Sequence, residues 1–159
     1  MKYYLPILLF ALLSTSCVDN YVSSIPDYLV GLQLNLTSTY PTFKNSTNQS
    51  LIFIKGVTPN IPEGEFTGYG GIIVCSEIMV DDYGNTIYCA FDMSCPYEHK
   101  PNIRVYPKKN GFGQVICDSC KSIFNIGYGY GDPTPESKAK EFLKRYRAQL
   151  SGDYLTIQR

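Results

Sequence analysis

The sequence contains no tryptophan, a single histidine and no excess of either charge, and these absences narrow the chemistry open to the chain. The 159 residues include 14 basic and 14 acidic ones, with no lysine-rich face, so nothing indicates nucleic-acid binding. Because His99 is the only imidazole and no Ser–His–Asp order is visible, most acid–base catalysts are excluded. Glu98 has no second carboxylate at a convincing spacing. We therefore do not expect an enzyme in its own right.

Long apolar runs are also missing, apart from one near the N-terminus. The run from Leu5 to Leu13 is too short to span a bilayer and follows the basic Lys2, as in a secretory signal. Small residues and then Cys17 follow, and this order resembles the lipobox of bacterial lipoproteins; the alternative is an ordinary signal peptide with a chance cysteine. We expect a signal peptide over 1–16, a tether over 17–27 lipidated at Cys17, and one domain over 28–159.

The lipid would anchor the protein to a bacterial membrane, in the cell envelope and most simply at the outer membrane of a Gram-negative bacterium. The membrane is thus the first expected partner. Envelope compartments also permit disulfide bonds.

Glycine, proline and tyrosine are abundant, which is typical of a turn-rich β protein. Leu32, Leu34 and Leu36 alternate with polar residues, as in a half-buried strand. The segments 71–80 and 85–93 flank a DDYG turn and predict a hairpin. Further strands are expected at 51–57, 102–107 and 113–117, and a Gly-rich turning loop at 122–135. The expected fold class is all-β.

The segment 137–150 is ambiguous. Thr134 and Pro135 resemble a helix start, and apolar residues then follow helical spacing up to Leu150. However, 151–153 reads as a turn and 154–158 alternates like a strand, so 143–150 could equally be its hairpin partner. Periodicity alone favours the helix.

Five cysteines remain if Cys17 is lipidated, and an odd number cannot all pair within one chain. In a hairpin centred on the DDYG turn, Cys75 lies opposite Asp92 and not opposite Cys89, so a disulfide between the two cysteines would need a bulge. We interpret Cys75 and Cys89 as buried thiols that act as small apolar residues.

The other three cysteines lie in two loops, each after a predicted strand: Cys95-Pro96 after 85–93, and Cys117-x-x-Cys120 after 113–117. With Ser122 and Phe124 behind the second loop and a terminal hairpin, residues 68–158 resemble the Rieske 2Fe–2S domain. That resemblance implies stacked antiparallel sheets with a two-loop cluster-binding subdomain, in which two cysteines bind one iron and two histidines the other. Cys95 and Cys117 match the cysteine ligands.

Two positions depart from the family pattern: Tyr97 and Cys120 stand where its histidine ligands would be. One interpretation is that Cys95, Cys117 and Cys120, with His99 as fourth ligand, bind zinc or a mixed-ligand iron–sulfur cluster. A second is a disulfide from Cys95 to Cys117 or Cys120. A third is an inert scaffold with reduced thiols.

The leading expectation is a membrane-anchored, Rieske-like envelope protein with a 2Fe–2S cluster or a metal, transferring electrons to an unidentified redox or envelope partner. The alternative is a structural or binding lipoprotein with a degenerate, cluster-free Rieske fold held by a disulfide.

Overall fold

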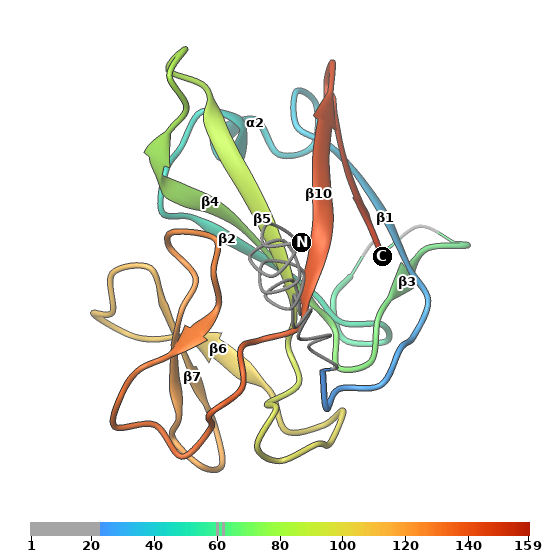
Figure 1. Ribbon diagram of the computed structural model, residues 1–159. Helices are drawn as coiled ribbons and strands as arrows, with labels where there is room; N and C mark the ends of the chain where they lie inside the picture. The colour runs from blue at the N-terminus through green and yellow to red at the C-terminus, as the bar shows by residue number, and fades with distance from the viewer. Residues whose placement is uncertain (1–22, 60, 62) are drawn as a thin grey trace, which may run out of the picture.

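The chain forms two antiparallel β-sheets, seen in a computed structural model that describes residues 23–59, 61 and 63–159 (Figure 1). The all-β prediction is therefore confirmed. The larger sheet has the strand order β2-β4-β5-β10-β11-β1-β3, and the smaller sheet the order β6-β7-β8-β9. The helix α2 (Pro41–Lys44) is a single turn. The strands are β1 (Val30–Asn35), β2 (Ser50–Phe53), β3 (Phe66–Thr67), β4 (Ile72–Val80), β5 (Thr86–Asp92), β6 (Val105–Pro107), β7 (Gln114–Cys117), β8 (Ile123–Asn125), β9 (Asp132–Pro133), β10 (Arg145–Ser151) and β11 (Tyr154–Gln158).

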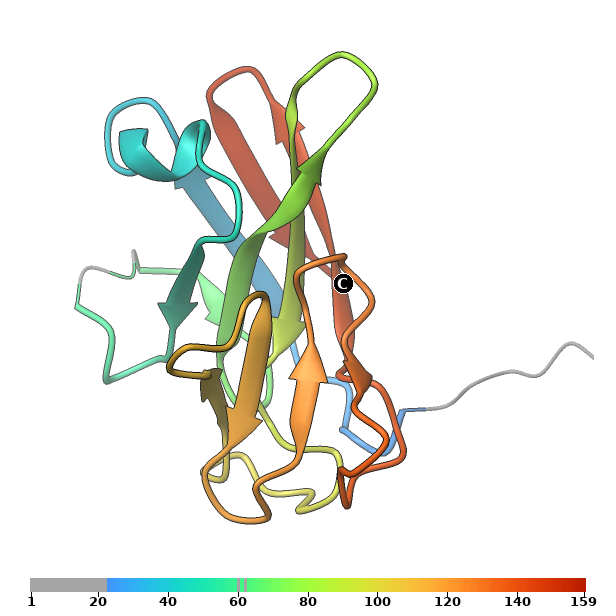
Figure 2. The same cartoon turned by 90° about the vertical axis from the view of Figure 1, so that its left-hand side faces the viewer.

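The larger sheet curves round one hydrophobic core, which the alternating residues of β1 help to fill (Figures 1 and 2). Leu32 and Leu34 are buried in it, as predicted, and Leu36 follows directly after the strand. The β1 strand pairs with β11, and β11 pairs with β10, so the first and the last strand lie side by side in the sheet. The predicted strand at 51–57 is shorter than expected and ends at Phe53.

The β4–β5 hairpin is buried on both faces over residues 72–76 and 88–92, which explains the nearly continuous apolar sequence there, and it is exposed toward its turn. Ile72, Val74 and Ala90 face the core inside the larger sheet. Ile73 and Phe91 face a second core, against which the smaller sheet packs (Figure 2). This second core also contains all five cysteines of the described residues. The hairpin is thus the shared wall between the two sheets.

The predicted register of this hairpin is wrong. Cys75 lies opposite Cys89, and Asp92 pairs with Ile72, because a bulge between Ser76 and Val80 shifts the strands. Both thiols are buried and unbonded, as expected of small apolar residues.

Residues 145–151 form strand β10, so the helix favoured by periodicity is wrong and the hairpin alternative is correct. Strand β10 lies between β5 and β11: its first residues, Arg145 and Tyr146, pair with β5, and residues 147–151 pair with β11. The Tyr146 side chain is buried. The predicted strands at 102–107 and 113–117 are found as β6 and β7. The expected loop at 122–135 contains two short strands, β8 and β9, that complete the smaller sheet.

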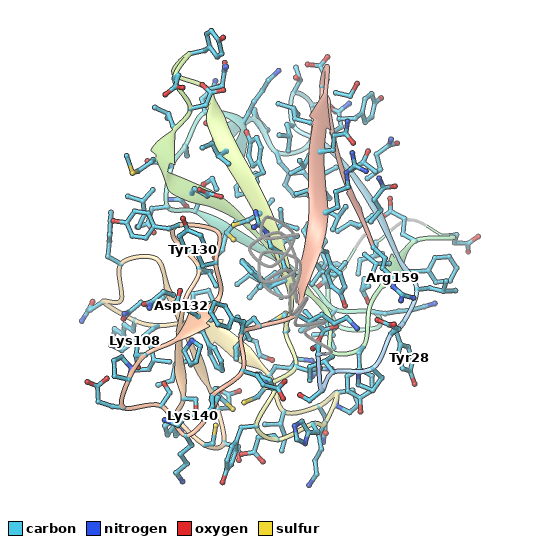
Figure 3. All side chains as sticks on the ribbon, in the orientation of Figure 1. Tyr28, Lys108, Tyr130, Asp132, Lys140 and Arg159 are labelled. Atoms are coloured by element: carbon cyan, nitrogen blue, oxygen red, sulfur yellow. The ribbon has the colours of Figure 1, made fainter. Side chains whose placement is uncertain are left out.

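The end of the predicted tether packs on the domain. Ile25 is buried, and the Ser24 hydroxyl donates a hydrogen bond to the carbonyl of Pro96 in the first cysteine loop. Asp27 forms ion pairs with Lys144 and Arg159. In Figure 3, Arg159 lies on the opposite side of the molecule from Lys108 and Asp132. The predicted signal peptide and the lipidation site Cys17 lie outside the described residues. None of the described helices is long and apolar enough to cross a membrane.

Burial of Cys75 predicts a loss of stability at alkaline pH in the reduced, metal-free protein. Burial, and then the neighbouring Cys89, raise the pKa of the Cys75 thiol well above its ordinary value. The unfolded chain ionises this thiol near pH 8.5, while the folded chain keeps it neutral. The free energy of unfolding that this thiol contributes is therefore constant below that pH. Above it, the free energy of unfolding falls by about 1.4 kcal/mol per pH unit because of Cys75 alone.

Urea unfolding between pH 7.5 and 9.5, with reductant and chelator, measures this slope. The Cys75→Ala variant is expected to show a shallower decline than the unmodified chain. Equal slopes would contradict the assignment, since they would mean that Cys75 ionises as easily in the folded protein as in the unfolded one.

Gly70 lies against the start of the first cysteine loop, and its substitution is expected to disturb that loop. A Cβ at this position would overlap the Ser94 hydroxyl and lie 2.7 Å from the Ser94 backbone nitrogen. Because the backbone nitrogen of Ser94 cannot move aside as a flexible side chain could, Gly70→Ala is expected to destabilise the fold by about 2–3 kcal/mol. Gly31→Ala is the matched control, since its Cβ would meet only a Phe66 ring carbon at 3.9 Å. Thermal unfolding of both variants tests this, and similar melting temperatures would contradict it.

Candidate metal centre

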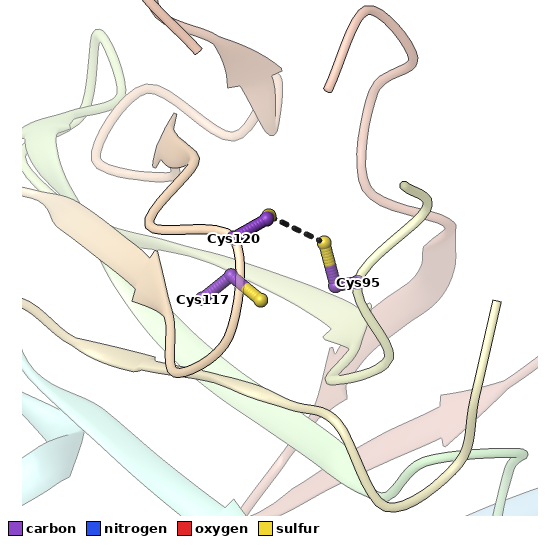
Figure 4. A group of neighbouring side chains, drawn as sticks. All are labelled: Cys95, Cys117 and Cys120. Carbon is purple, nitrogen blue, oxygen red and sulfur yellow. Dashed lines mark hydrogen bonds between the residues drawn. The ribbon is translucent and has the colours of Figure 1, made fainter. Parts of the chain in front are cut away.

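Three buried thiols meet between the two cysteine loops. Cys95 comes from the loop after β5, Cys117 ends β7, and Cys120 lies in the turn that follows (Figure 4). The Sγ atoms of Cys95 and Cys120 are 3.6 Å apart, and all three sulfur atoms lie within 4.8 Å of one another. Sulfurs bound tetrahedrally to one zinc ion at 2.3 Å would be about 3.8 Å apart. The spacing therefore suits a single ion.

Backbone pairing holds the two loops together. An isolated bridge joins Ser94 to Arg104, and the amide of Cys95 donates to the carbonyl of Ile103. The chain then enters β6, where Val105 pairs with Cys117. Since β6 and β7 are paired, the loop before β6 lies directly beside the loop after β7.

The thiols differ in how readily they ionise. Burial raises the pKa of Cys95 and, less strongly, that of Cys117, although backbone amides of each loop act in the opposite direction. Burial also opposes ionisation of Cys120, but hydrogen bonds from the hydroxyl and amide of Ser122 and from the neighbouring thiols outweigh it and lower its pKa. Cys120 is thus the thiol most ready to give the thiolate that a metal requires.

Ser122 ties the site to the long segment after β9. Its Oγ lies 3.1 Å from the Cys120 Sγ and accepts a hydrogen bond from the amide of Ala139 at 2.9 Å. Ala139 and Leu143 are buried in the same core as the thiols. The sequence drew attention to Ser122 only as part of the Rieske resemblance, and nothing in it indicated the contact with Ala139.

The structure brings together three of the four predicted ligands. Cys95, Cys117 and Cys120 form the one group of three or more Cys, His, Asp or Glu side chains suited to an ion among the described residues. The side chain of His99 is exposed and is not in this group, so its role as a ligand stays a prediction. Tyr97 is 51% exposed. All five described cysteines are unbonded to one another.

These donors do not fit the ligand set of a Rieske cluster. Such a cluster needs two imidazoles on its second iron, whereas this chain has a single histidine. The resemblance drawn from the sequence would put Tyr97 and Cys120 at the two histidine positions. A phenol binds only after losing a proton with an ordinary pKa near 10. Three thiols that converge on one point instead suit a tetrahedral ion with a fourth ligand still to be assigned. In comparisons with protein-family models, curated proteins and solved structures, nothing matches this chain.

Proposed function

We propose that this chain is a metal-binding protein of the bacterial cell envelope, with one ion held by the thiolates of Cys95, Cys117 and Cys120. The observation that carries the proposal is the convergence of three buried sulfur atoms, from two separate loops, within 4.8 Å of one another. Thiolates are soft ligands that select zinc or iron over magnesium or calcium.

A single ion is favoured over a two-iron cluster by the spacing of the sulfurs. Two sulfurs 3.6 Å apart would suit either a single ion or one iron of a cluster, since a cluster also holds two ligands on each iron. The third sulfur favours the single ion, because all three lie within 4.8 Å of one another and a cluster would spread them over two irons. With iron, the centre would change oxidation state and transfer electrons to a partner protein. With zinc it would be structural, since zinc has no redox chemistry.

The envelope location rests on the N-terminal segment. The apolar run ending at Leu13 and the small residues before Cys17 support a lipid anchor. The two antiparallel sheets, with one cysteine loop before β6 and the other after β7, support a Rieske-like domain as the anchored part. We propose this domain as a Rieske-like scaffold adapted to a single ion.

The competing function is a structural lipoprotein in which Cys95 and Cys120 form a disulfide. Their sulfur atoms are close enough that a small rotation of the side chains would bring them to bonding distance. The bond would form with loss of two protons and transfer of two electrons to an oxidant of the envelope. Cys117 would then remain as a free thiol.

Metal analysis with a visible spectrum and a thiol count, on the full chain purified without oxygen, separates these possibilities. One equivalent of zinc or iron without acid-labile sulfide supports the proposal. Two irons with two sulfides would instead show a cluster. A metal-free protein with three free thiols among the five described cysteines would show the disulfide, and both of these results would overturn the single-ion proposal.

A further inference from the structure

The two cysteine loops have the same backbone design. In the first, Cys95 is followed four residues later by His99 with φ of 55°; in the second, Cys117 is followed four residues later by Lys121 with φ of 61°. A positive φ is uncommon outside glycine. Its recurrence at the same offset shows that both loops turn in the same way.

Backbone amides lie beside the sulfur at the same offsets in the two loops. Those of Tyr97 and Glu98 act on the Cys95 thiol, and those of Ser119 and Cys120 act on the Cys117 thiol. The Glu98 amide also donates a hydrogen bond to the Cys95 carbonyl. In each loop the amides beside the sulfur thus belong to the second and third residues after the cysteine. Such amides stabilise a bound thiolate.

Exposure of the side chains differs at the first and fifth residues after the cysteine, where Pro96 and Ser122 are buried and Asp118 and Lys100 are exposed. It agrees around the third residue, which in both loops is less exposed than the residue on either side. In the second loop Asp118, Ser119 and Lys121 are exposed, while Cys120, the third residue after Cys117, is buried and belongs to the metal group. In the first loop Tyr97, His99 and Lys100 are exposed, while Glu98, the third residue after Cys95, is partly buried. Glu98 therefore occupies in the first loop the position that Cys120 occupies in the second.

We propose that the carboxylate of Glu98 is the fourth ligand and completes a centre of three thiolates and one carboxylate. This inference rests on the proposed function. Carboxylate oxygen binds zinc at 2.0–2.2 Å, and four ligands satisfy a tetrahedral site. The Glu98 carboxylate lies outside the group of three thiols, so the side chain turns inward when the ion binds. His99 corresponds to Lys121, whose exposed side chain donates a hydrogen bond to the carbonyl of Asp118, and is not a ligand in this arrangement.

Titration of the metal-free full chain with Co²⁺, in competition with a chelator, tests this assignment. Glu98→Gln is expected to lower the Co²⁺ affinity at least about tenfold, since even groups that only support a ligand cost 10- to 100-fold when removed. Glu98→Cys creates a second Cys-x-x-Cys loop and is expected to keep tight binding. Its thiolate-to-cobalt absorption should rise by about a third, because four thiolates replace three.

Asp118→Asn is the matched control, because it removes one exposed carboxylate from the second loop without touching a proposed ligand. Its affinity should stay within about twofold of the unmodified chain. If Glu98→Gln binds as tightly as Asp118→Asn, or if His99→Ala loses affinity and Glu98→Gln does not, the Glu98 assignment is wrong while the three-thiol site stands. If the unmodified chain binds no metal, both the site and the assignment are wrong.

Discussion

Replacing Cys120 with serine is expected to lower the affinity for zinc by about two to three orders of magnitude. Structural zinc sites contribute about 10–16 kcal/mol of binding free energy, and an even share among four ligands is about 2.5–4 kcal/mol for each. Serine is close to cysteine in size, so the fold should persist, but its hydroxyl does not ionise as a thiol does. The loss is large because the Sγ of Cys120 lies 3.6 Å from that of Cys95, and because Cys120 is the thiol of the three whose pKa is lowered.

Cys89→Ser is the matched control for this experiment. Cys89 is as buried as the site thiols, but its Sγ faces the carbonyls of Cys75 and Ile126 and takes no part in the group of three. Calorimetric titration with zinc should show one site of nearly unchanged affinity in Cys89→Ser and a much weaker one in Cys120→Ser. Equal affinities in the two variants would show that zinc does not bind through the three thiols.

The sequence predicts a strand well where its apolar residues either alternate with polar ones or form one continuous run. The alternation around Leu32 and Leu34 identifies β1, and the apolar runs beside the DDYG turn identify β4 and β5. Short strands escape prediction, because β8 and β9 contain three and two residues and have no room for a pattern. Their pairing is decided by neighbours in the smaller sheet.

Two predictions for the larger sheet are wrong, the helix around Tyr146 and the register of the β4–β5 hairpin. In both cases the pairing of strands decides the outcome. Helical spacing around Tyr146 is real, but β5 and β11 on either side of β10 offer this segment two hydrogen-bonded ladders, and tertiary pairing outweighs local propensity. The register of Cys75 could not be read from the turn, because the bulge between Ser76 and Val80 adds its shift inside the strand.

For the candidate site, spacing along the chain identifies the three thiols but not the geometry around them. The Cys-x-x-Cys spacing and the Rieske resemblance both point to Cys95, Cys117 and Cys120, and these do converge. The correspondence between Glu98 and Cys120 emerges only from the backbone angles and from the amides beside each sulfur. The residue types do not indicate it, because a lysine such as Lys121 is not typical at a positive φ.

A buried carboxylate fixes the first cysteine loop, and its removal is expected to have the largest effect on stability. Asp92, at the end of β5, is fully buried and accepts hydrogen bonds from the amides of Tyr69, Gly70 and Ser94 and from the hydroxyl of Tyr146. It thereby joins the 68–71 loop, strand β10 and the residue directly before Cys95. Burial of the Tyr146 phenol and then the charge of Asp92 raise the pKa of that phenol, which stays a donor at neutral pH.

Asp92→Ala should reduce the free energy of unfolding by about 4 kcal/mol, because four buried donors lose their acceptor together. Tyr146→Phe removes only one of these bonds, and its expected cost is about 1–1.5 kcal/mol. Urea unfolding of both variants measures the difference, and equal costs would contradict the role of Asp92 as a shared acceptor.

A structural role of Asp92 confined to the larger sheet would leave the metal site intact. The bond to Ser94 predicts otherwise: zinc affinity should fall in Asp92→Ala and not in Tyr146→Phe, because only the former frees the backbone that positions Cys95.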